Sequence, residues 1–458
     1  MDFVLCFATP ASAIAALDPP PFGIWRFEVQ GGPPIGWRSA TRGRPSVRAT
    51  LFAHVASERV VLQDGWLPAA LDYRVTERRL HDVLAGWPAR AAAEIQSGGW
   101  GELTRRPARI TPQSAAPDPQ YPSVRSSGRE RYPPDAELLR WLCSQPARRL
   151  WHWWREAARY DTWNVGIAAL DGPLTDLRQL ESLGAVRWLP ARPSLYYLAD
   201  PFPYRQDGRD WLLVEEYGHP KGMRGRISRV DAVDASSRAL VPAITCDSHL
   251  SYPYTFEDGS HVLCAPEIHQ EDGCIVYRLG DDGSWRPLHH VLRGRQVVDP
   301  TFFQHDGRWW LLCTDYRDKI GNLILHGYHA DTLAGPWTAH ALNPLKSDLA
   351  SARPAGRPFT LGGCLYRPAQ DCSQTYGGAV TVMKVEALTP TAFRETPALR
   401  LEPDPSSPYP DGRHHLVIDG TRVYLDGKKQ RFDYLLWLKA WTRRPWSFVP
   451  GARSVPGP

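Results

Sequence analysis

The 458-residue sequence predicts a mainly β protein, a five-bladed β-propeller preceded by a small α/β module. Three observations predict this fold. A hairpin pattern recurs about every fifty residues in the second half, each copy joins two apolar or aromatic runs through an Asp-Gly or Gly-Gly pair, and the first hundred or so residues mix strand and helix patterns. Such pairs supply the positive φ angles that two-residue turns need. A strand repeat of this length is typical of propeller blades.

Five copies of the hairpin fit between Asp200 and Phe432. They read PFPYRQDGRDWLLVEE (201–216), YPYTFEDGSHVLCAPE (252–267), PTFFQHDGRWWLLCTD (300–315), RPFTLGGCLYRPAQD (357–371) and HHLVIDGTRVYLDG (414–427). We assign the propeller to residues 161–432. Its innermost strands are expected to begin near Asp200, Tyr252, Asp299, Arg353 and His414.

The flanking segments have different patterns. Residues 1–105 predict an α/β module with strands at 3–8 and 23–29, a hairpin around 48–64 and a helix through 75–95. The Pro-, Ser- and Arg-rich residues 106–134 predict a linker. Residues 135–160 predict a helical connector that is interrupted at Pro146, and 433–458 form a basic, Trp-rich C-terminal segment.

Composition narrows the class of protein. The net charge of +5 is dispersed, which does not favour a nucleic-acid partner, and eight cysteines without a C-x-x-C pair predict free thiols. Asp2 replaces the basic start of a signal peptide, and no apolar run is long enough to span a membrane. We therefore expect a cytoplasmic protein, with peripheral membrane contact through YLLWLKAWTRRPW (434–446) as an alternative to a capping helix.

Acidic residues recur at fixed distances from the turns. Nine residues beyond the first turn residue stand Glu216, Glu267, Asp315 and Asp371, and seven residues before it stand Asp200 and Asp299. These positions lie at the hairpin end away from the turn, so the acids are expected around one mouth of the channel. The alternative is that they bind backbone amides between blades.

The acids suggest glycosyl chemistry, because an oxocarbenium-like transition state needs carboxylates on opposite faces of the sugar. Asp200, Glu267 and Asp299 are the candidate catalytic residues. The candidate substrate-binding residues are Glu216, Tyr252, Asp315, Arg353, Arg357, Arg367, Asp371 and His415. The three arginines suit a phosphate group, or else ion pairs with the rim acids. Because neighbouring residues on a strand face opposite ways, His414 and His415 predict no metal cage, and we predict no metal and no cofactor.

These motifs resemble a known clan of five-bladed propellers, that of arabinanases, β-xylosidases of the family 43 type and fructan-processing enzymes. LADPFP (198–203), VVDPTFF (297–303) and APEIH (265–269) carry the resemblance. It implies that Asp200 is a base or nucleophile, Asp299 stabilises the transition state and Glu267 is the general acid. The order of the residues departs from the fructan enzymes, and Tyr252 stands where arabinanases have Asp.

A closer resemblance is to bacterial proteins of polysaccharide loci and to the N-terminal domain of plant glucosamine inositolphosphorylceramide transferases. The matching text is WNVGI (163–167), LADPF (198–202), LSYP (250–253), SARPAGR (351–357) and YRPAQDCS (366–373). The bacterial proteins often carry a formyltransferase-like module, which FGIWRFEVQGGPPIGW (22–37) and VVLQDGWLP (60–68) resemble. The Asn-His pair of that module is absent at 26–29, so we expect a degenerate, noncatalytic version.

The sequence therefore predicts a glycosyltransferase of surface polysaccharide or glycolipid synthesis. Its partners would be a phosphate-activated donor (a nucleotide sugar or sugar phosphate), a glycan or glycolipid acceptor, and other members of a polysaccharide synthase complex. Two alternatives remain. One is a glycoside hydrolase, which does not need the arginines, and the other is a noncatalytic carbohydrate-binding scaffold, which does not need the carboxylates.

Overall fold

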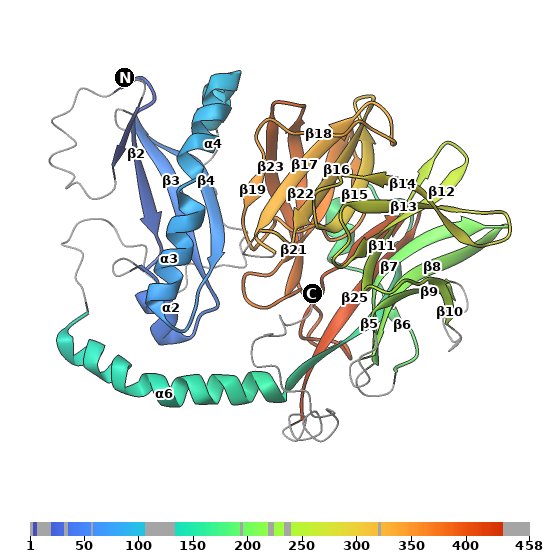
Figure 1. The fold of residues 1–458 in the computed structure, drawn as a ribbon, viewed down its shortest axis with the longest axis horizontal. Helices are drawn as coiled ribbons and strands as arrows, with labels where there is room; N and C mark the ends of the chain where they lie inside the picture. The colour runs from blue at the N-terminus through green and yellow to red at the C-terminus, as the bar shows by residue number, and fades with distance from the viewer. Residues whose placement is uncertain are drawn as a thin grey trace.

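The structure is a computed structural model that describes residues 3–6, 20–31, 35–55, 58–105, 133–192, 196–218, 224–232, 240–318 and 322–433. Nearly all of the predicted linker and the C-terminal segment 434–458 lie outside the described residues. The described chain is mainly β and forms six sheets (Figure 1). None of its helices has the length and apolar character that crossing a membrane requires.

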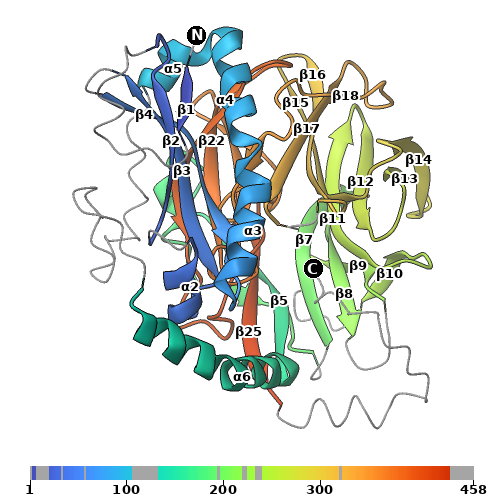
Figure 2. The same ribbon diagram turned by 60° about the vertical axis from the view of Figure 1, so that its left-hand side comes forward.

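The N-terminal residues form a four-stranded sheet with helices packed against it (Figure 2). Its strands and helices are β1 (Val4–Cys6), β2 (Ile24–Val29), β3 (Ser46–Val55), β4 (Glu58–Pro68), α2 (Trp37–Arg42), α3 (Tyr73–Leu84), α4 (Trp87–Glu94), η1 (Ile95–Gly99) and α5 (Trp100–Arg105). The predicted strands are confirmed. The single helix predicted over 75–95 is wrong, because the chain breaks at Gly86 and restarts with Pro88 in the first turn of α4.

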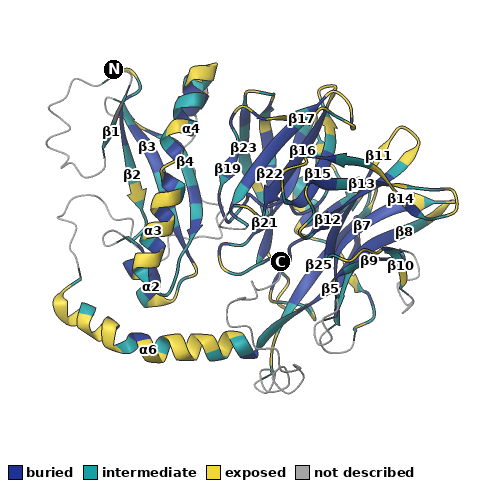
Figure 3. Cartoon of the chain, viewed as in Figure 1, coloured by how far each residue is buried: buried dark blue, intermediate teal, exposed yellow. Residues whose placement is uncertain are grey.

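The connector is a single helix, α6 (Asp135–Ala158), which continues through Pro146. The predicted interruption is therefore wrong. A proline inside a helix removes one backbone hydrogen-bond donor. Asp135 and Glu137, in the first turn, stabilise the helix through their interaction with the positive end of the helix dipole. α6 is largely exposed (Figure 3) and leads directly into the first strand of the β-rich part.

Five further antiparallel sheets follow, four of them with four strands and the third with five. Sheet 1 contains β7 (Tyr196–Gln206), β8 (Arg209–Gly218), β9 (Arg226–Asp231) and β10 (Val241–Ile244). Sheet 2 contains β11 (Leu250–Asp258), β12 (His261–Ile268), β13 (Cys274–Leu279) and β14 (Trp285–Val291). Sheet 3 contains β15 (Val297–His305), β16 (Arg308–Asp315), β17 (Ile324–Ala330) and β18 (Thr338–Ala339), with β19 (Lys346–Ser347) also paired to β17. Sheet 4 contains β20 (Phe359–Leu361), β21 (Cys364–Asp371), β22 (Ala379–Leu388) and β23 (Phe393–Leu401).

Sheet 5 joins the two ends of this part of the chain. It is ordered β24 (Leu416–Asp419), β25 (Arg422–Phe432), β5 (Arg159–Ala169) and β6 (Arg187–Trp188). β25 and β5 pair antiparallel over their whole length, from Arg422 opposite Ala169 to Phe432 opposite Arg159. This long pairing ties residues 159–432 into one unit.

The predicted hairpin turns are confirmed in three sheets. Both turn residues have positive φ in the turns at 207–208, 306–307 and 362–363. Aromatic side chains then fill the space between sheets, as where the rings of Phe256 (β11) and Phe302 (β15) stack with centroids 5.2 Å apart. Each fully buried side chain of this kind contributes roughly 1.5–3 kcal/mol of transfer free energy. Packing between sheets therefore holds their first strands, β7, β11 and β15, close together.

The N-terminal sheet is joined to sheet 3 through β4 and the segment after β19. The backbone amide of Trp66 donates to the Asp348 carboxylate at 2.9 Å, and the amide of Leu349 donates to the carbonyl of Trp66 at 2.9 Å. Leu323 and Leu349 also complete the apolar core of the N-terminal sheet. The two parts of the chain thus share a core.

Candidate functional site

The first strands of sheets 1, 2 and 3 carry the same irregularity. Asp200, Tyr252 and Asp299 have φ of 51°, 43° and 49°, and each stands within a shift of strand register. Each is followed by proline. A bulge re-aims the side chain that it carries, and left-handed backbone at a non-glycine residue costs roughly 1–3 kcal/mol and is common at functional sites. Local strain therefore marks three equivalent positions.

Carboxylates from neighbouring sheets hold these bulges. Asp426 Oδ2 accepts the amide of Asp200 at 3.4 Å, Asp200 Oδ2 accepts the amide of Tyr252 at 3.2 Å, and Glu267 Oε2 accepts the amide of Asp299 at 3.2 Å. The alternative structural role that the sequence left open is thus present for Asp200 and Glu267. Only one oxygen of each carboxyl group accepts such a backbone bond, however. The other oxygen of Glu267, Oε1, is buried without a hydrogen-bond partner.

The predicted register of the acids is wrong by one residue in sheet 2. The prediction placed the turn at Asp258-Gly259, but Asp258 pairs with His261, so the turn residues are Gly259 and Ser260. A slip of one residue moves a side chain to the opposite face of a sheet. Glu267 pairs with Ser251 and is thus the equivalent of Glu215, which pairs with Ala199, rather than of Glu216.

Asp299 and Arg353 form a buried ion pair at the site. Both carboxylate oxygens of Asp299 accept bonds from Arg353, whose guanidinium also donates to Asn322. Gln370 donates its amide to Asp299 Oδ2 at 3.2 Å. Arg353 Nη2 lies 4.0 Å from Glu267 Oε2, so one arginine lies beside two carboxyl groups. These contacts place Asp299 and Glu267 at one position between sheets 2, 3 and 4.

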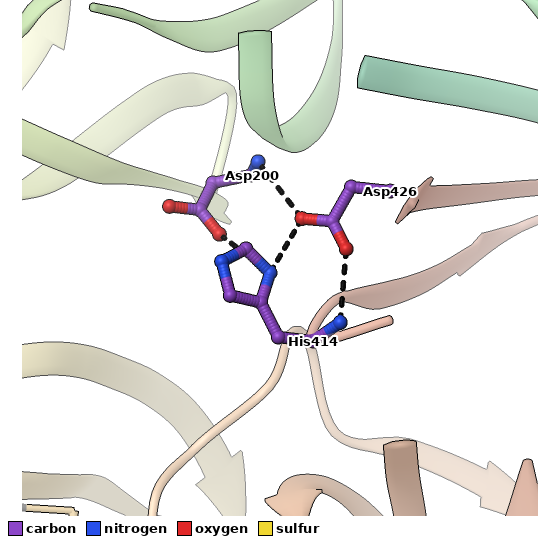
Figure 4. A group of neighbouring side chains, drawn as sticks. All are labelled: Asp200, His414 and Asp426. Atoms are coloured by element: carbon purple, nitrogen blue, oxygen red, sulfur yellow. Dashed lines mark hydrogen bonds and ion pairs between the residues drawn. The ribbon is translucent and has the colours of Figure 1, made fainter. Parts of the chain in front are cut away.

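On the other side of the site, Asp200 lies beside a histidine–aspartate pair (Figure 4). His414 Nδ1 lies 2.5 Å from Asp426 Oδ2 and 3.8 Å from Asp200 Oδ1. Although burial opposes it, Asp426 and Asp200 raise the pKa of His414, and His414 in turn lowers the pKa of Asp426 despite the burial of that carboxylate. His414 and Asp426 therefore form a compensated pair next to Asp200.

The prediction that His414 and His415 face opposite ways is wrong. Both precede β24, so the alternation of strand side chains does not apply, and His415 Nδ1 also lies 3.6 Å from Asp200 Oδ1. His415 Nε2 contacts the carbonyl of Pro201 at 3.0 Å, and burial lowers the pKa of His415 to about 3. His415 is thus a neutral packing and hydrogen-bonding residue beneath Asp200.

Asp200, His414 and Asp426 also form a donor set that could suit a metal ion, with one ligand atom of each within 4.8 Å of the others. The Asp426 carboxylate already accepts the amides of His414 and His415 at 3.0 and 3.1 Å and faces the His414 ring. A metal would have to displace these interactions. We therefore interpret the group as an ion pair that positions Asp200.

The charges of the site do not balance. We call the residues Asp200, Glu267, Asp299, Arg353, His414 and Asp426 the carboxylate centre. Arg353 pairs with Asp299 and His414 pairs with Asp426, which leaves Asp200 and Glu267 without a cation of their own. Burial, and after it the nearby charge of Asp299, raises the pKa of Glu267 to about 8. Burial also raises the pKa of Asp200 well above its usual range. Glu267 therefore keeps its proton at neutral pH, and burial disfavours ionisation of Asp200.

Half-buried tyrosines surround the centre. Burial raises the pKa values of all three rings, and each interacts electrostatically with a different acid of the centre: Tyr197 with Asp200, Tyr316 with Glu267, and Tyr376 with Asp299. The guanidinium of Arg353 lies 5.3 Å from the centroid of the Tyr376 ring. Aromatic rings beside a polar centre can stack on the apolar face of a ligand and leave their hydroxyl groups for hydrogen bonds.

The remaining predicted substrate-binding acids have partners of their own. Glu216 accepts two bonds from Arg226, at 2.9 and 3.0 Å, and one from Ser228. Asp315 accepts the amide of Arg317 at 2.9 Å, and Asp371 pairs with Arg400 at 2.8 Å. Each stands one strand position beyond the equivalent of Glu267, so its side chain is on the other face of the sheet. The structure therefore does not bring these acids to the centre.

Two of the three predicted phosphate-binding arginines also have internal roles. Arg357 donates to the carbonyls of Pro203 and Thr255, at 3.3 and 2.8 Å. Arg367 makes two 2.7 Å bonds to Glu395. Only Arg353 belongs to the centre. The hydroxyl of the predicted residue Tyr252 bonds Thr301 at 3.0 Å and accepts the amide of Gly356 at 2.9 Å, so this side chain links sheets rather than facing a substrate.

Sequence reasoning missed Asp426, Gln370, Asn322 and the three tyrosines. Asp426 and Gln370 stand inside the quoted motifs YLDG and RPAQD, so a register counted from strand pairing would have found both. Asn322, Tyr316 and Tyr376 stand in connecting segments without a repeat, where one sequence gives no signal, and Tyr197 stands on β7 directly before the quoted motif LADPF.

Comparison with known proteins identifies relatives of this part of the chain. Residues 190–408 match the family model "Glucosamine inositolphosphorylceramide transferase 1, N-terminal". The chain is 32% identical over 259 residues to Glucosamine inositolphosphorylceramide transferase 1 of Oryza sativa subsp. japonica, covering 52% of this chain and 34% of the relative. The protein of that name from Arabidopsis thaliana is 29% identical over 260 residues, covering 51% and 33%. The predicted resemblance to the plant proteins is confirmed, and the chain spans about a third of their length.

Solved structures that resemble the chain are glycoside hydrolases. A thermostable family-43 glycoside hydrolase covers 46% of this chain and 77% of its own, at 12% identity and a TM-score of 0.34. Zg3597, a family 117 glycoside hydrolase from Zobellia galactanivorans, covers 58% and 90%, at 14% identity and a TM-score of 0.36. At these TM-scores the likeness carries no conclusion about the site.

Proposed function

We propose that the protein is a carbohydrate-active enzyme that transfers a glycosyl group at the carboxylate centre. The observation that carries the proposal is Glu267, a carboxyl group with one free oxygen and a pKa of about 8, beside the Asp299–Arg353 pair. A group that is protonated near neutral pH and buried against a fixed charge has the properties of a general acid. The relatives are named as transferases, which favours transfer.

We further propose that sheets 1 to 5 are the blades of the predicted five-bladed propeller. Three features support it: the five antiparallel sheets in sequence order, the closing of sheet 5 from both ends, and the hydrogen bonds that join neighbouring sheets at the bulges. In this arrangement the carboxylate centre would lie on the propeller axis, where each bulge adds a side chain. The domain limits predicted from the sequence, 1–105 for the module and 161–432 for the propeller, belong to the same proposal.

The chemistry assigned to each residue follows from its charge. As the bond between the anomeric carbon and the leaving oxygen breaks, Glu267 gives its proton to that oxygen. Asp299, held by Arg353 and Gln370, provides a fixed negative charge for the cationic sugar. An acceptor hydroxyl attacks the anomeric carbon and gives its proton to the ionised Asp200. This step needs Asp200 in its ionised form, which burial disfavours and a protonated His414 beside it favours.

A glycoside donor fits this centre better than the predicted phosphate-activated donor. A departing alcohol needs a proton, whereas a departing phosphate is stable as an anion and needs none. The arginines predicted to hold phosphate are bonded to Asp299, to backbone carbonyls and to Glu395. Hydrolysis is the second candidate function, because the same carboxylates serve when water replaces the acceptor hydroxyl.

Contact with a membrane surface, which would suit a glycolipid acceptor, is supported by α6. It exposes Leu139, Leu142, Leu150, Trp151 and Trp153, whose side chains are 48–66% exposed. Tryptophan and leucine on an exposed helix that also carries arginines are typical of interfacial helices. Sedimentation with anionic phosphatidylglycerol vesicles would test it. A Trp151→Ser, Trp153→Ser double variant should bind less, and equal binding would contradict the contact.

We propose that the N-terminal module is a noncatalytic, formyltransferase-like domain, since β2 carries Arg26 to Val29 where the Asn-His pair would stand. Its role in the structure is to pack on sheet 3 through Trp66. Formyl transfer from a folate donor to an amino sugar, measured as product, would contradict this proposal. The bacterial polysaccharide context and a synthase complex remain predictions from sequence.

The acid role of Glu267 is tested by varying the leaving group. With Glu267→Gln, turnover of an alkyl glycoside should fall about 10³-fold, while turnover of the matching p-nitrophenyl glycoside, whose leaving group needs no proton, should fall far less. Glu257→Gln, which replaces an exposed glutamate of the same hairpin, is the matched control. Product analysis with and without an added glycan acceptor separates transfer from hydrolysis. If both donors lose turnover equally, or neither does, the acid assignment is wrong.

A further inference from the structure

A cavity borders the carboxylate centre at Asp426. It has a volume of about 870 Å³ and lies between the segment 180–188, which includes β6, and residues 400–413, which end β23 and lead to β24. Asp426 and Arg413 both line it. Since the Asp426 carboxylate is occupied by His414, His415 and Asp200, Asp426 separates the cavity from the centre rather than serving it.

Arg413 is a buried cation without a bonded anion. Its side chain is only 8% exposed, and within the described residues its guanidinium makes no hydrogen bond or ion pair. Burial lowers the pKa of Arg413, and the more distant Asp426 and Asp404 only partly oppose that effect. Buried guanidinium groups normally have bonded acceptors, because a buried charge without a partner is strongly destabilising. The free guanidinium that lines the cavity therefore indicates a site for an anion.

The walls of the cavity suit a sugar ring. The rings of Trp188 and Tyr409 have centroids 4.7 Å apart, both are half-buried, and both line the cavity. The hydroxyl of Tyr409 accepts a bond from Asn164 at 2.9 Å, which fixes this ring. Aromatic faces beside a polar wall provide stacking for the apolar face of a pyranose and hydrogen bonds for its hydroxyls.

The charge around the entrance limits the charge of the ligand. Glu181, Glu402 and Asp404 also line the cavity and are exposed. They are screened by solvent but still disfavour a dianion. A single carboxylate, by contrast, fits the planar fork of one arginine.

We propose that this cavity binds an acidic sugar, a pyranose with one carboxylate, through Arg413 and the Trp188–Tyr409 wall. The site is separate from the carboxylate centre, so the proposal does not need the centre to be catalytic. Glucuronate is the probe of the proposed chemistry, glucose is the same ring without the anion, and glucose 1-phosphate carries the anion as phosphate.

The experiment is calorimetric titration of the whole protein with these three sugars. We expect glucuronate to bind more tightly than glucose 1-phosphate and glucose to bind at least 10-fold more weakly than glucuronate. Arg413→Gln should weaken glucuronate binding at least 10-fold, Arg413→Lys should restore part of it, and Arg209→Gln, at an exposed arginine, should change nothing. Tyr409→Leu tests the wall without touching the guanidinium, and we expect weaker binding of glucuronate.

Several results would overturn the proposal. They are no heat or thermal shift with glucuronate, equal affinity for glucose and glucuronate, or binding that survives Arg413→Gln. Tighter binding of glucose 1-phosphate than of glucuronate would replace the carboxylate by phosphate as the ligand group and so contradict the proposal as stated. Glucuronate binding in Glu267→Gln is expected to be unchanged. Loss of binding there would place the ligand at the centre and remove the second site, whatever the turnover measurements show.

Discussion

Two buried charge clusters lie within the same β-rich part of the chain, and they are built in opposite ways. In the first, Glu395 of sheet 4 faces two cations, Arg367 at 2.7 Å and Lys346 at 2.8 Å. In the carboxylate centre, four carboxyl groups face one arginine and one imidazolium. Both clusters are nine-tenths buried or more, so burial alone does not distinguish them.

The difference appears in the protonation of the acids. Although burial opposes it, Arg367 and Lys346 lower the pKa of Glu395 to about 2, whereas burial and Asp299 raise the pKa of Glu267 to about 8. The first cluster is fully compensated and has no proton to exchange near neutral pH. The second retains protons that a bound substrate can take. A buried cluster with fewer cations than carboxyl groups is thus the better candidate for chemistry, and a compensated one for stability.

The largest effect is expected from removing the carboxylates assigned to the reaction. Asp299→Asn and Asp200→Asn should each lower glycosyl turnover by about 10³-fold or more, because an amide keeps the volume but cannot carry the charge of Asp299 or accept the proton that Asp200 takes. Turnover per folded molecule, with folding checked by circular dichroism, is the measurement. Asp306→Asn, at the exposed turn of the same strand as Asp299, is the control. Near-normal turnover in both variants would make the centre structural and favour the scaffold alternative.

Removing the acid of the compensated cluster should instead affect stability. Glu395→Gln leaves Arg367 and Lys346 without their shared carboxylate, so the free energy of unfolding should fall by about 3–5 kcal/mol. Turnover of the remaining folded protein should be unchanged. Since the pKa of Glu395 is lowered in the folded state, its stabilisation is present above the unfolded pKa near 4.5 and is lost as pH falls towards 2. Glu386→Gln, whose partner Arg394 is partly exposed, should cost under about 1 kcal/mol.

The same substitution in the centre should have the opposite effect on stability. The folded pKa of Glu267 is raised, so its contribution is complete below the unfolded pKa near 4.5 and is lost as pH rises through about 8. Above pH 8 the wild-type protein must bury a charge that Glu267→Gln does not have. At pH 9 the variant should therefore be more stable by at least about 1 kcal/mol, or some 2–4 °C in Tm. The difference in free energy of unfolding, variant minus wild type, should thus be larger at pH 9 than at pH 6. A smaller difference at pH 9 would contradict this.

The smallest effect is expected at the acids that the sequence wrongly placed in register with Glu267. Glu216→Gln should change turnover less than twofold and the free energy of unfolding by under about 1 kcal/mol, because its partner Arg226 is partly exposed. A strong loss of turnover would show that sheet 1 presents its acids differently from the pairing seen here.

Much of the fold could be predicted because hairpin turns and alternating apolar residues are local signals. The Asp-Gly and Gly-Gly turns fixed the strand pairs, and the Asp-Pro motifs at Asp200 and Asp299 marked two of the bulges. The turn of sheet 2 shows the limit, since EDGS offers two adjacent turn positions and only the pairing of Asp258 with His261 decides between them. Whether an arginine faces a substrate or a neighbouring carboxylate depends on contacts between sheets, which explains the internal partners of Arg357 and Arg367.

The protonation state of the centre tests the account most directly, since it needs no substrate. Infrared difference spectra between pH 7 and pH 10 should show the C=O stretch of a protonated carboxyl group at pH 7, and this band should be weaker in Glu267→Gln and unchanged in Glu395→Gln. The band of Glu267 should disappear as pH rises through about 8. A wild-type protein without any protonated carboxyl band at pH 7, or a band that Glu267→Gln leaves intact, would contradict a centre with fewer cations than carboxyl groups in which Glu267 retains its proton.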